Sequence, residues 1–166
     1  MQRRTILGIL AAAPLFGARA LGATPNADMS VQEPLNGWKA LSDAGWKQRL
    51  APAQYDVLRH EGTEAAGSSP LNGEKRPGIF ACAGCALPLF DSSMKYDSGT
   101  GWPSFFTHLA GAVQTKRDFR LIWPRTEYHC ARCGGHQGHV FDDGPAPTGQ
   151  RWCNNGVALA FLPKQA

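Results

Sequence analysis

Two cysteine pairs constrain this chain more than any other feature of its sequence. Cys82 and Cys85 are separated by two residues, and Cys130 and Cys133 repeat that spacing. Two such C-x-x-C turns are typical of a tetrahedral site in which four thiolates hold one zinc ion and leave no coordination position open. The pattern therefore predicts one structural zinc ion per chain, whose binding free energy is part of the folding free energy.

Each pair also has a glycine near its second thiol, Gly84 and Gly134, where the backbone has to turn so that both sulfurs face one ion. The alternative is that the cysteines form disulfides, within a pair or between the pairs. An oxidising compartment outside the cytoplasm favours disulfides over free thiols. The location of the protein therefore bears on the choice between metal and disulfide.

The amino-terminal segment predicts export to the bacterial periplasm. Residues 1–23 begin with basic residues, continue with an apolar run over residues 6–16 and end in small residues, as a secretory signal peptide does. The run is shorter than the roughly 20 residues that cross a bilayer, which favours cleavage over a retained anchor. Arg3 and Arg4 resemble a twin-arginine signal, which exports folded proteins, and they also suit an ordinary signal. We expect no stable membrane insertion after cleavage and a flexible linker over residues 24–41.

Most of the excess positive charge belongs to the predicted signal peptide. The chain has 17 Lys and Arg residues against 13 Asp and Glu residues, a formal net charge of +4. Removal of Arg3, Arg4 and Arg19 leaves 14 basic against 13 acidic residues, a net charge of +1. No clustered Lys/Arg stripe remains, so no nucleic acid partner is expected and a nucleic-acid-binding zinc ribbon is disfavoured.

The remaining chain predicts one domain over residues 42–163. Two short helices are expected in residues 42–61, where Pro52 suits a first helical turn and apolar residues recur at helical spacings, at Trp46, Leu50, Tyr55 and Leu58. β-Branched and aromatic residues predict short antiparallel strands at residues 78–82, 119–123, 126–130 and 157–161. The 19 Gly and 12 Pro residues indicate a loop-rich fold that a metal site would stabilise.

Cys153 is the one cysteine of five that the two pairs leave over. Arg151, Asn154 and Asn155 give it a cation and two amides as neighbours, which can favour the reactive thiolate. The alternative is that Cys153 is a small buried hydrophobic residue. Since an unused thiol is a liability in an oxidising compartment, we interpret Cys153 as a catalytic thiol.

Candidate partners for this thiol occur in two other segments. His136 and His139 lie three residues apart, and imidazoles exchange protons near neutral pH, so both could face one pocket. They could equally be further metal ligands or structural histidines. Trp102 follows a glycine-rich segment and suits a methyl-sulfur substrate, because sulfur packs well against aromatic rings. The alternative is that Trp102 fills the core together with Phe105 and Phe106.

Six motifs in order resemble the methionine-R-sulfoxide reductases, the B-type peptide-methionine sulfoxide reductases. The resemblance covers residues 46–161, and its motifs are G-T-E at 62–64, C-A-G-C at 82–85, Y-D-S-G-T-G-W-P-S-F at 96–105, C-A-R-C-G-G-H-Q-G-H-V-F at 130–141, D-G-P-A-P-T-G at 143–149 and R-W-C-N-N at 151–155. It implies a mainly β, tent-like fold of two antiparallel sheets with short peripheral amino-terminal helices. The four-cysteine zinc site would lie away from the catalytic pocket.

The resemblance also implies a mechanism. Cys153 would attack the sulfoxide sulfur of methionine-R-sulfoxide, chiefly in oxidised proteins or peptides, and become a sulfenic acid, while His136 and His139 handle the proton. Asn155 would complete the catalytic set beside the nucleophile. The residues implied in substrate binding are Trp102, Arg151, Phe141 and Asp143.

Two departures from the family pattern stand out. Thr100 occupies the position where many members have a resolving cysteine, so we expect an external reductant, either a thioredoxin-like protein or a small thiol, to regenerate Cys153. Trp152 stands where the family commonly has tyrosine. The rival hypothesis from another class is a non-catalytic zinc-stapled binding module, which accounts for the cysteine pairs but leaves Cys153, the histidines and Trp102 without a purpose.

Overall fold

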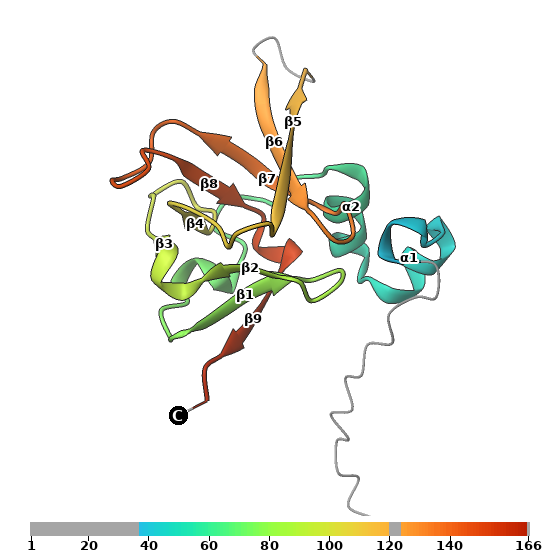
Figure 1. The fold of residues 1–166 in the computed structure, drawn as a ribbon. Helices are drawn as coiled ribbons and strands as arrows, with labels where there is room; N and C mark the ends of the chain where they lie inside the picture. The colour runs from blue at the N-terminus through green and yellow to red at the C-terminus, as the bar shows by residue number, and fades with distance from the viewer. Residues whose placement is uncertain (1–36, 120–123, 166) are drawn as a thin grey trace, which may run out of the picture. The chain divides into compact units, whose positions relative to one another are not determined.

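The computed structural model describes residues 37–119 and 124–165 (Figure 1). The predicted signal peptide, most of the predicted linker and residues 120–123 lie outside the described residues. Helical segments occur first in the chain and between strands, with bounds η1 Trp38–Ala40, α1 Asp43–Arg49, α2 Pro52–His60, η2 Pro70–Gly73, η3 Ser92–Met94 and η4 Gly156–Ala158. The strands are β1 Gly78–Cys82, β2 Pro88–Asp91, β3 Lys95–Tyr96, β4 Ser104–Phe105, β5 Val113–Asp118, β6 Arg125–Cys130, β7 His136–Phe141, β8 Arg151–Asn154 and β9 Leu159–Pro163.

The two predicted helices are confirmed as α1 and α2. The Ser42 hydroxyl caps α1 by accepting a hydrogen bond from the Gly45 N–H at 3.2 Å, and Pro52 stands in the first turn of α2. The packed part of the chain begins earlier than residue 42. Trp38, inside the predicted linker, is buried with its ring centroid 6.1 Å from that of Trp46.

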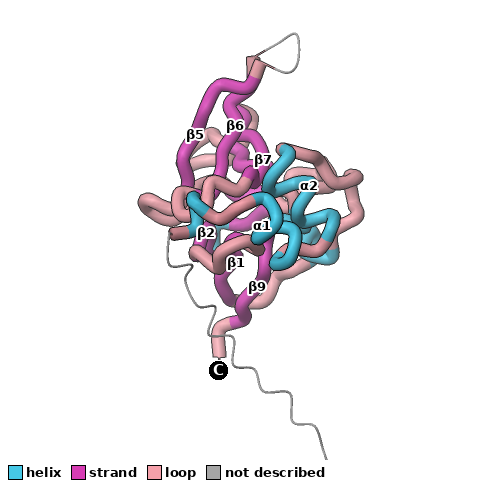
Figure 2. The backbone as a smooth tube through the Cα atoms, turned by 90° about the vertical axis from the view of Figure 1, so that its right-hand side faces the viewer, coloured by secondary structure: helices cyan, strands magenta, loops and turns pink. Residues whose placement is uncertain are grey.

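The strands form two antiparallel sheets, which confirms the predicted fold class. The smaller sheet has the order β2-β1-β9, and the larger has the order β3-β4-β8-β7-β6-β5. Figure 2 shows the helices gathered at one side of the strands, where α2 packs against β7 and η4. The described residues contain no helix that is long and apolar enough to span a membrane.

Two predicted strands differ from the structure. The segment 157–161 begins as the 3-10 turn η4, because the Glu64 carboxylate accepts hydrogen bonds from the Gly156 and Val157 N–H groups and pulls them out of a strand ladder. The strand predicted at 119–123 falls almost wholly outside the described residues, and the preceding strand β5 ends at Asp118. Phe119 is not in a strand, and the rest of that segment lies outside the described residues.

Aromatic side chains from both sheets form the core between them. Phe90 of β2 stacks on Phe105 of β4 with ring centroids 4.0 Å apart, and Phe80 of β1 meets the Phe105 ring edge-on at 5.1 Å. Tyr128 of β6 packs edge-on against Trp152 of β8 at 5.0 Å. These contacts pack β4, which pairs with β8 in the larger sheet, against the smaller sheet, and they pack β6 against β8.

Candidate active site

The four paired cysteines occupy two equivalent turns, each at the end of a strand. Cys82 ends β1 and Cys130 ends β6, and in each turn the residue four positions later donates its N–H to the cysteine carbonyl, Ala86 at 2.8 Å and Gly134 at 2.9 Å. Gly134 has a φ of 70°, as expected for a left-handed turn residue, whereas in the first turn Ala86 takes that conformation with a φ of 57°. Gly84 is not the turning residue that the sequence predicted.

The sulfur positions fit one metal ion. The Cys82 and Cys133 sulfurs are 3.7 Å apart, those of Cys85 and Cys130 are 3.5 Å apart, and all four lie within 4.8 Å of one another. Tetrahedral thiolates bonded at about 2.3 Å to zinc have neighbouring sulfurs about 3.8 Å apart, whereas disulfide sulfurs are about 2.0 Å apart. All four cysteines are buried, free thiols, so the cluster has the geometry of a metal site.

Cys153 lies away from this cluster, on β8. Its neighbours across the sheet are Ser104 on β4 and His139 on β7. Gly138 permits the close approach of β7 and β8, because a Cβ atom at this position would lie 1.9 Å from the Cys153 carbonyl oxygen. The half-buried thiol therefore sits on a strand that is held from both sides.

A cavity of about 140 Å³ opens at this thiol. That volume is comparable to an internal cavity that holds a benzene-sized ligand, so it suits the end of one side chain. Its walls come from the three strands β6, β7 and β8 and from the segments around them, and they are formed by Thr63, Trp102, Arg125, Gly138, His139, Phe141, Cys153, Asn154 and Asn155. Five of the eight predicted catalytic and substrate-binding residues thus meet at one cavity.

The environment of the thiol differs from the sequence-based expectation. Burial raises the pKa of Cys153 above its ordinary value, and this outweighs the Arg151 guanidinium and a hydrogen bond from Thr100, both of which lower the pKa. The amides of Asn154 and Asn155 form hydrogen bonds with other residues. The resting form is therefore the thiol, and a neighbouring group has to accept its proton.

His139 is the lining residue suited to that task. Its Nε2 lies 2.8 Å from an Asp118 carboxylate oxygen, which also accepts a hydrogen bond from Arg125 at 2.7 Å. Burial lowers the pKa of His139, and the Asp118 carboxylate opposes that shift only in part. A neutral imidazole that is held by a carboxylate can accept the proton of a nearby thiol.

His136 is brought to His139 by an irregularity in β7. Residues three apart in a regular strand point to opposite faces, yet the two rings lie 5.4 Å apart between centroids. The register between β6 and β7 shifts where Tyr128 faces Gly138 and His129 faces His136, which leaves Gln137 as an extra residue. This β-bulge turns the His136 side chain toward the face of the sheet that carries His139.

His136 itself is buried and is not among the residues lining the cavity. Its Nδ1 lies 2.7 Å from Glu127, whose other carboxylate oxygen is 3.0 Å from Nδ1 of His129. Burial alone would raise the pKa of Glu127, but the two histidines lower it to about 2. Each predicted catalytic histidine thus has a buried carboxylate partner, Glu127 for His136 and Asp118 for His139.

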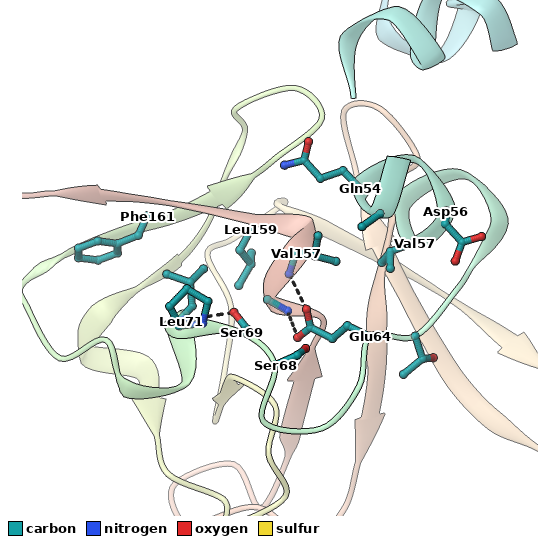
Figure 3. A pocket seen from close by; sticks show the side chains of 14 residues that line it. Gln54, Asp56, Val57, Glu64, Ser68, Ser69, Leu71, Val157, Leu159 and Phe161 are labelled. Atoms are coloured by element: carbon teal, nitrogen blue, oxygen red, sulfur yellow. Dashed lines mark hydrogen bonds between the residues drawn. The ribbon is translucent and has the colours of Figure 1, made fainter. Parts of the chain in front are cut away.

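The segment containing Glu64 fixes two further predicted site residues. The Glu64 N–H donates to Asn155 Oδ1 at 3.0 Å, and the Glu64 carbonyl accepts a hydrogen bond from Trp102 Nε1 at 3.1 Å. Its carboxylate accepts from the N–H groups of Gly156 and Val157 at 2.6 and 2.9 Å, as Figure 3 shows. Glu64 therefore joins the Trp102 loop to the end of β8.

The other predicted substrate-binding residues divide into two kinds. Phe141 lines the cavity, whereas Arg151 and Asp143 are not among its lining residues. Arg151 donates two hydrogen bonds of 2.8 Å to the Asp143 carboxylate and lies 4.3 Å from the centroid of the Phe141 ring. Arg151 therefore packs against Phe141, is held by Asp143, and also acts on the Cys153 thiol by lowering its pKa. Phe105, unlike Trp102, belongs to the core.

Several residues at this site were not predicted from the sequence. Thr63 and Arg125 line the cavity, and Glu64, Asp118 and Glu127 bind other site residues through hydrogen bonds. Thr63 and Glu64 belong to the G-T-E motif at 62–64, to which the family resemblance assigns no catalytic or binding role. Asp118 and Arg125 are paired across the ends of β5 and β6, a relation that depends on strand register and leaves no local signal.

Comparison with known proteins agrees with this arrangement. A SelR domain model matches residues 50–163. Peptide methionine sulfoxide reductase B1 of Arabidopsis thaliana chloroplasts is 47% identical over 146 residues, covering 87% of this chain and 72% of the relative. The peptide methionine sulfoxide reductase MsrB of Agrobacterium fabrum is 49% identical over 74% of this chain and 91% of its own, and that of Pseudomonas savastanoi pv. phaseolicola is 51% identical over 72% and 92%. The chain therefore belongs to the SelR-domain family of methionine-R-sulfoxide reductases of the B type.

Proposed function

We propose that this protein reduces methionine-R-sulfoxide in peptides and proteins, with Cys153 as the nucleophile. The observation that carries the proposal is the half-buried Cys153 thiol in a cavity sized for one side-chain end, opposite His139 and beside Trp102. Trp102 offers an aromatic face to the substrate methyl group. Asn155 and Phe141 complete the cavity wall and orient the substrate.

The chemical step is a two-electron exchange between two sulfur atoms. The Cys153 thiolate attacks the sulfoxide sulfur and forms a bond between the two sulfurs, while the sulfoxide oxygen is protonated and leaves as water. Water then attacks the Cys153 sulfur and breaks the bond between the sulfurs, so that methionine is released and Cys153 is left as a sulfenic acid. His139 takes the thiol proton and passes it to the sulfoxide oxygen through Nδ1, since Asp118 holds Nε2. His136 keeps His139 in place and shares proton transfer through its second ring nitrogen.

An external thiol then regenerates the enzyme, because Thr100 stands where a resolving cysteine would be and the other four cysteines belong to the metal cluster. The first thiol condenses with the sulfenic acid, releases water and leaves a mixed disulfide on Cys153. A second thiol releases Cys153 and carries away the oxidised product. A thioredoxin-like protein and a small dithiol are the two candidate reductants.

Zinc is the ion we propose for the four-cysteine cluster, at one per chain. Cys82, Cys85, Cys130 and Cys133 would hold it, and its chemistry there would be structural, because four sulfurs leave no position for substrate. We also propose that residues 1–23 direct export, which would place the reductase in the periplasm, where it would repair envelope proteins exposed to oxidants.

The direct test is an assay that resolves the two sulfoxide epimers, with dithiothreitol as reductant and a sulfoxide-containing peptide as substrate. We expect turnover of the R epimer alone. After one turnover without reductant, mass spectrometry should find a sulfenic acid or its trapped adduct on Cys153. Equal rates on the S epimer would overturn the assignment, and an intramolecular disulfide involving Cys153 would overturn the one-cysteine cycle.

The proposed proton path predicts how Cys153 reacts with iodoacetamide at different pH values. Because the thiol pKa is raised and the His139 pKa is lowered, the resting pair is neutral, so the thiolate fraction should rise as the pH passes a single inflection above the ordinary cysteine value of 9.0. His139→Gln should leave that inflection nearly unchanged while lowering the rate of sulfoxide reduction by about 10²–10⁴-fold. A second inflection near pH 6 that disappears in His139→Gln would instead identify a resting thiolate–imidazolium pair.

A further inference from the structure

Gln137 occupies an unusual place between the two sites described above. It is the extra residue of the bulge in β7, it has no exposed surface, and it does not line the cavity. The structural need for a bulge is satisfied by any residue, so the bulge does not explain why a polar side chain is buried there. A buried amide is costly unless its donors and acceptor are bonded.

Gln137 forms hydrogen bonds both to the four-cysteine cluster and to the residues that follow Cys153. Its Nε2 donates to the Cys82 sulfur at 3.4 Å, and its Oε1 accepts from Asn154 Nδ2 at 3.4 Å. Its backbone carbonyl accepts from both the N–H and the Nδ2 of Asn155, at 2.8 and 3.0 Å. One residue therefore contacts a sulfur of the metal cluster and both asparagines that follow Cys153.

The orientation of the Gln137 amide follows from these partners. With Nε2 at the sulfur, an N–H donor meets an electron-rich acceptor, and Oε1 meets the N–H donor of Asn154. The flipped amide would set an oxygen against the Cys82 sulfur and a donor against the donor of Asn154. When Cys82 is a metal-bound thiolate, the bond from Nε2 becomes charge-assisted and holds the side chain more firmly.

The buried four-cysteine cluster also needs hydrogen-bond donors directed at its sulfurs. Four thiolates around a divalent cation carry excess negative charge in a site without solvent, and N–H groups directed at the sulfurs offset it. Among the described residues, backbone N–H groups are directed at two other cluster sulfurs, that of Gly135 at Cys133, 3.4 Å away, and that of Cys133 at Cys130. The loss of the Gln137 amide would remove a side-chain donor that no backbone group replaces at Cys82.

We propose that Gln137 is a positioning residue that couples the metal cluster to the catalytic strand. The metal-bound Cys82 thiolate orients the Gln137 side chain, Gln137 orients Asn154 and Asn155, and these two residues set the carboxyl-terminal end of β8 beside the Cys153 thiol. The inference rests on the proposed zinc ion, and its effect on reduction rests on the proposed function. Coupling of this kind is reciprocal, so it has a readout at each end.

The first readout is the rate at which zinc passes from the folded protein to excess chelator. Gln137→Met keeps the shape of the side chain without its amide, and Gln137→Glu sets a carboxylate against the thiolate. Both variants should lose zinc at least about 10-fold faster than the wild type, with Glu the faster of the two. Tyr128→Phe is the matched control, because it removes the 2.7 Å bond to Asn154 and leaves Cys82 untouched. Zinc loss within twofold of wild type in both Gln137 variants, or equal acceleration in Tyr128→Phe, would refute the coupling.

The second readout is at the catalytic end and keeps the metal site filled. Exchange of zinc for cadmium lengthens the metal–sulfur bonds, so in the wild type it should shift the side-chain amide resonances of Asn154 and Asn155 and change kcat with little change in KM. In Gln137→Met the same exchange should leave both the resonances and kcat unmoved. Equal shifts in wild type and Gln137→Met would overturn the proposal. The zinc-transfer and resonance measurements need no turnover, so they remain decisive even for a chain that fails the epimer assay.

Discussion

Cys153→Ser is expected to lower the rate of sulfoxide reduction by at least about 10⁴-fold, because a serine hydroxyl is a far weaker nucleophile toward sulfur and cannot form a sulfenic acid. The substitution replaces one half-buried atom on β8 and leaves its strand pairing with β4 and β7 unchanged. The measurement is the rate of methionine formation from a peptide R-sulfoxide with dithiothreitol in excess.

The controls for this variant are measurements of its thermal stability and its zinc content. The melting temperature and the zinc content of Cys153→Ser should match those of the wild type, since Cys153 lies outside the four-cysteine cluster. The rival hypothesis of a binding module predicts unchanged ligand binding and no dependence of any activity on this thiol. A variant that retains more than a tenth of the wild-type rate would remove Cys153 from the mechanism.

Cys130→Ser is expected to have the largest effect on stability. Cys130 is fully buried at the end of β6, and its sulfur is one of the four that would hold the ion. Structural zinc contributes about 10–16 kcal/mol to the folding of small zinc domains, so even partial loss should lower the melting temperature by about 15 °C or more. Thermal unfolding followed by circular dichroism, with zinc measured by mass spectrometry, tests this expectation.

The same measurements distinguish a metal site from disulfide bonds at the four cysteines. If zinc holds the cluster, a strong chelator should destabilise the wild type and a reducing agent should not. Disulfides would give the opposite pattern, with less than about half an equivalent of zinc per chain. Cys153→Ser serves as the matched cysteine variant, since it changes the same atom type outside the cluster.

The four-cysteine cluster was predictable from the sequence because its geometry is local. Two residues between paired cysteines suffice to aim two sulfurs at one point, and the two turns then need only come together. The role of glycine in those turns was less predictable, since Ala86 takes the left-handed conformation in the first turn. Helices α1 and α2 were equally predictable from the sequence, because the capping by Ser42 and the position of Pro52 are local signals.

Most residues of the candidate active site were predictable from the sequence, but the contacts between them were not. A spacing of three residues in a strand sets His136 and His139 on opposite faces, and only the extra residue at Gln137 brings the rings together. The carboxylates of Asp118 and Glu127 reach the histidines across strand pairs, which depend on register rather than on spacing. Arg151 next to Cys153 suggested a stabilised thiolate, yet burial has the larger effect on the pKa of the thiol.

The position of Cys153 within a strand limits how the proposed external thiol can reach its sulfur. A cysteine on a loop could move outward to meet its reductant, but the backbone of Cys153 is paired with β4 on one side and β7 on the other, and its thiol lines a small cavity. In the proposed cycle, the donor therefore has to bring its own thiol into that cavity, which a donor with a recessed sulfur could not do. Selection among cellular thiols would therefore depend on the reach of the donor, and a slim dithiol should outcompete a bulkier protein whose reactive sulfur lies flush with its surface.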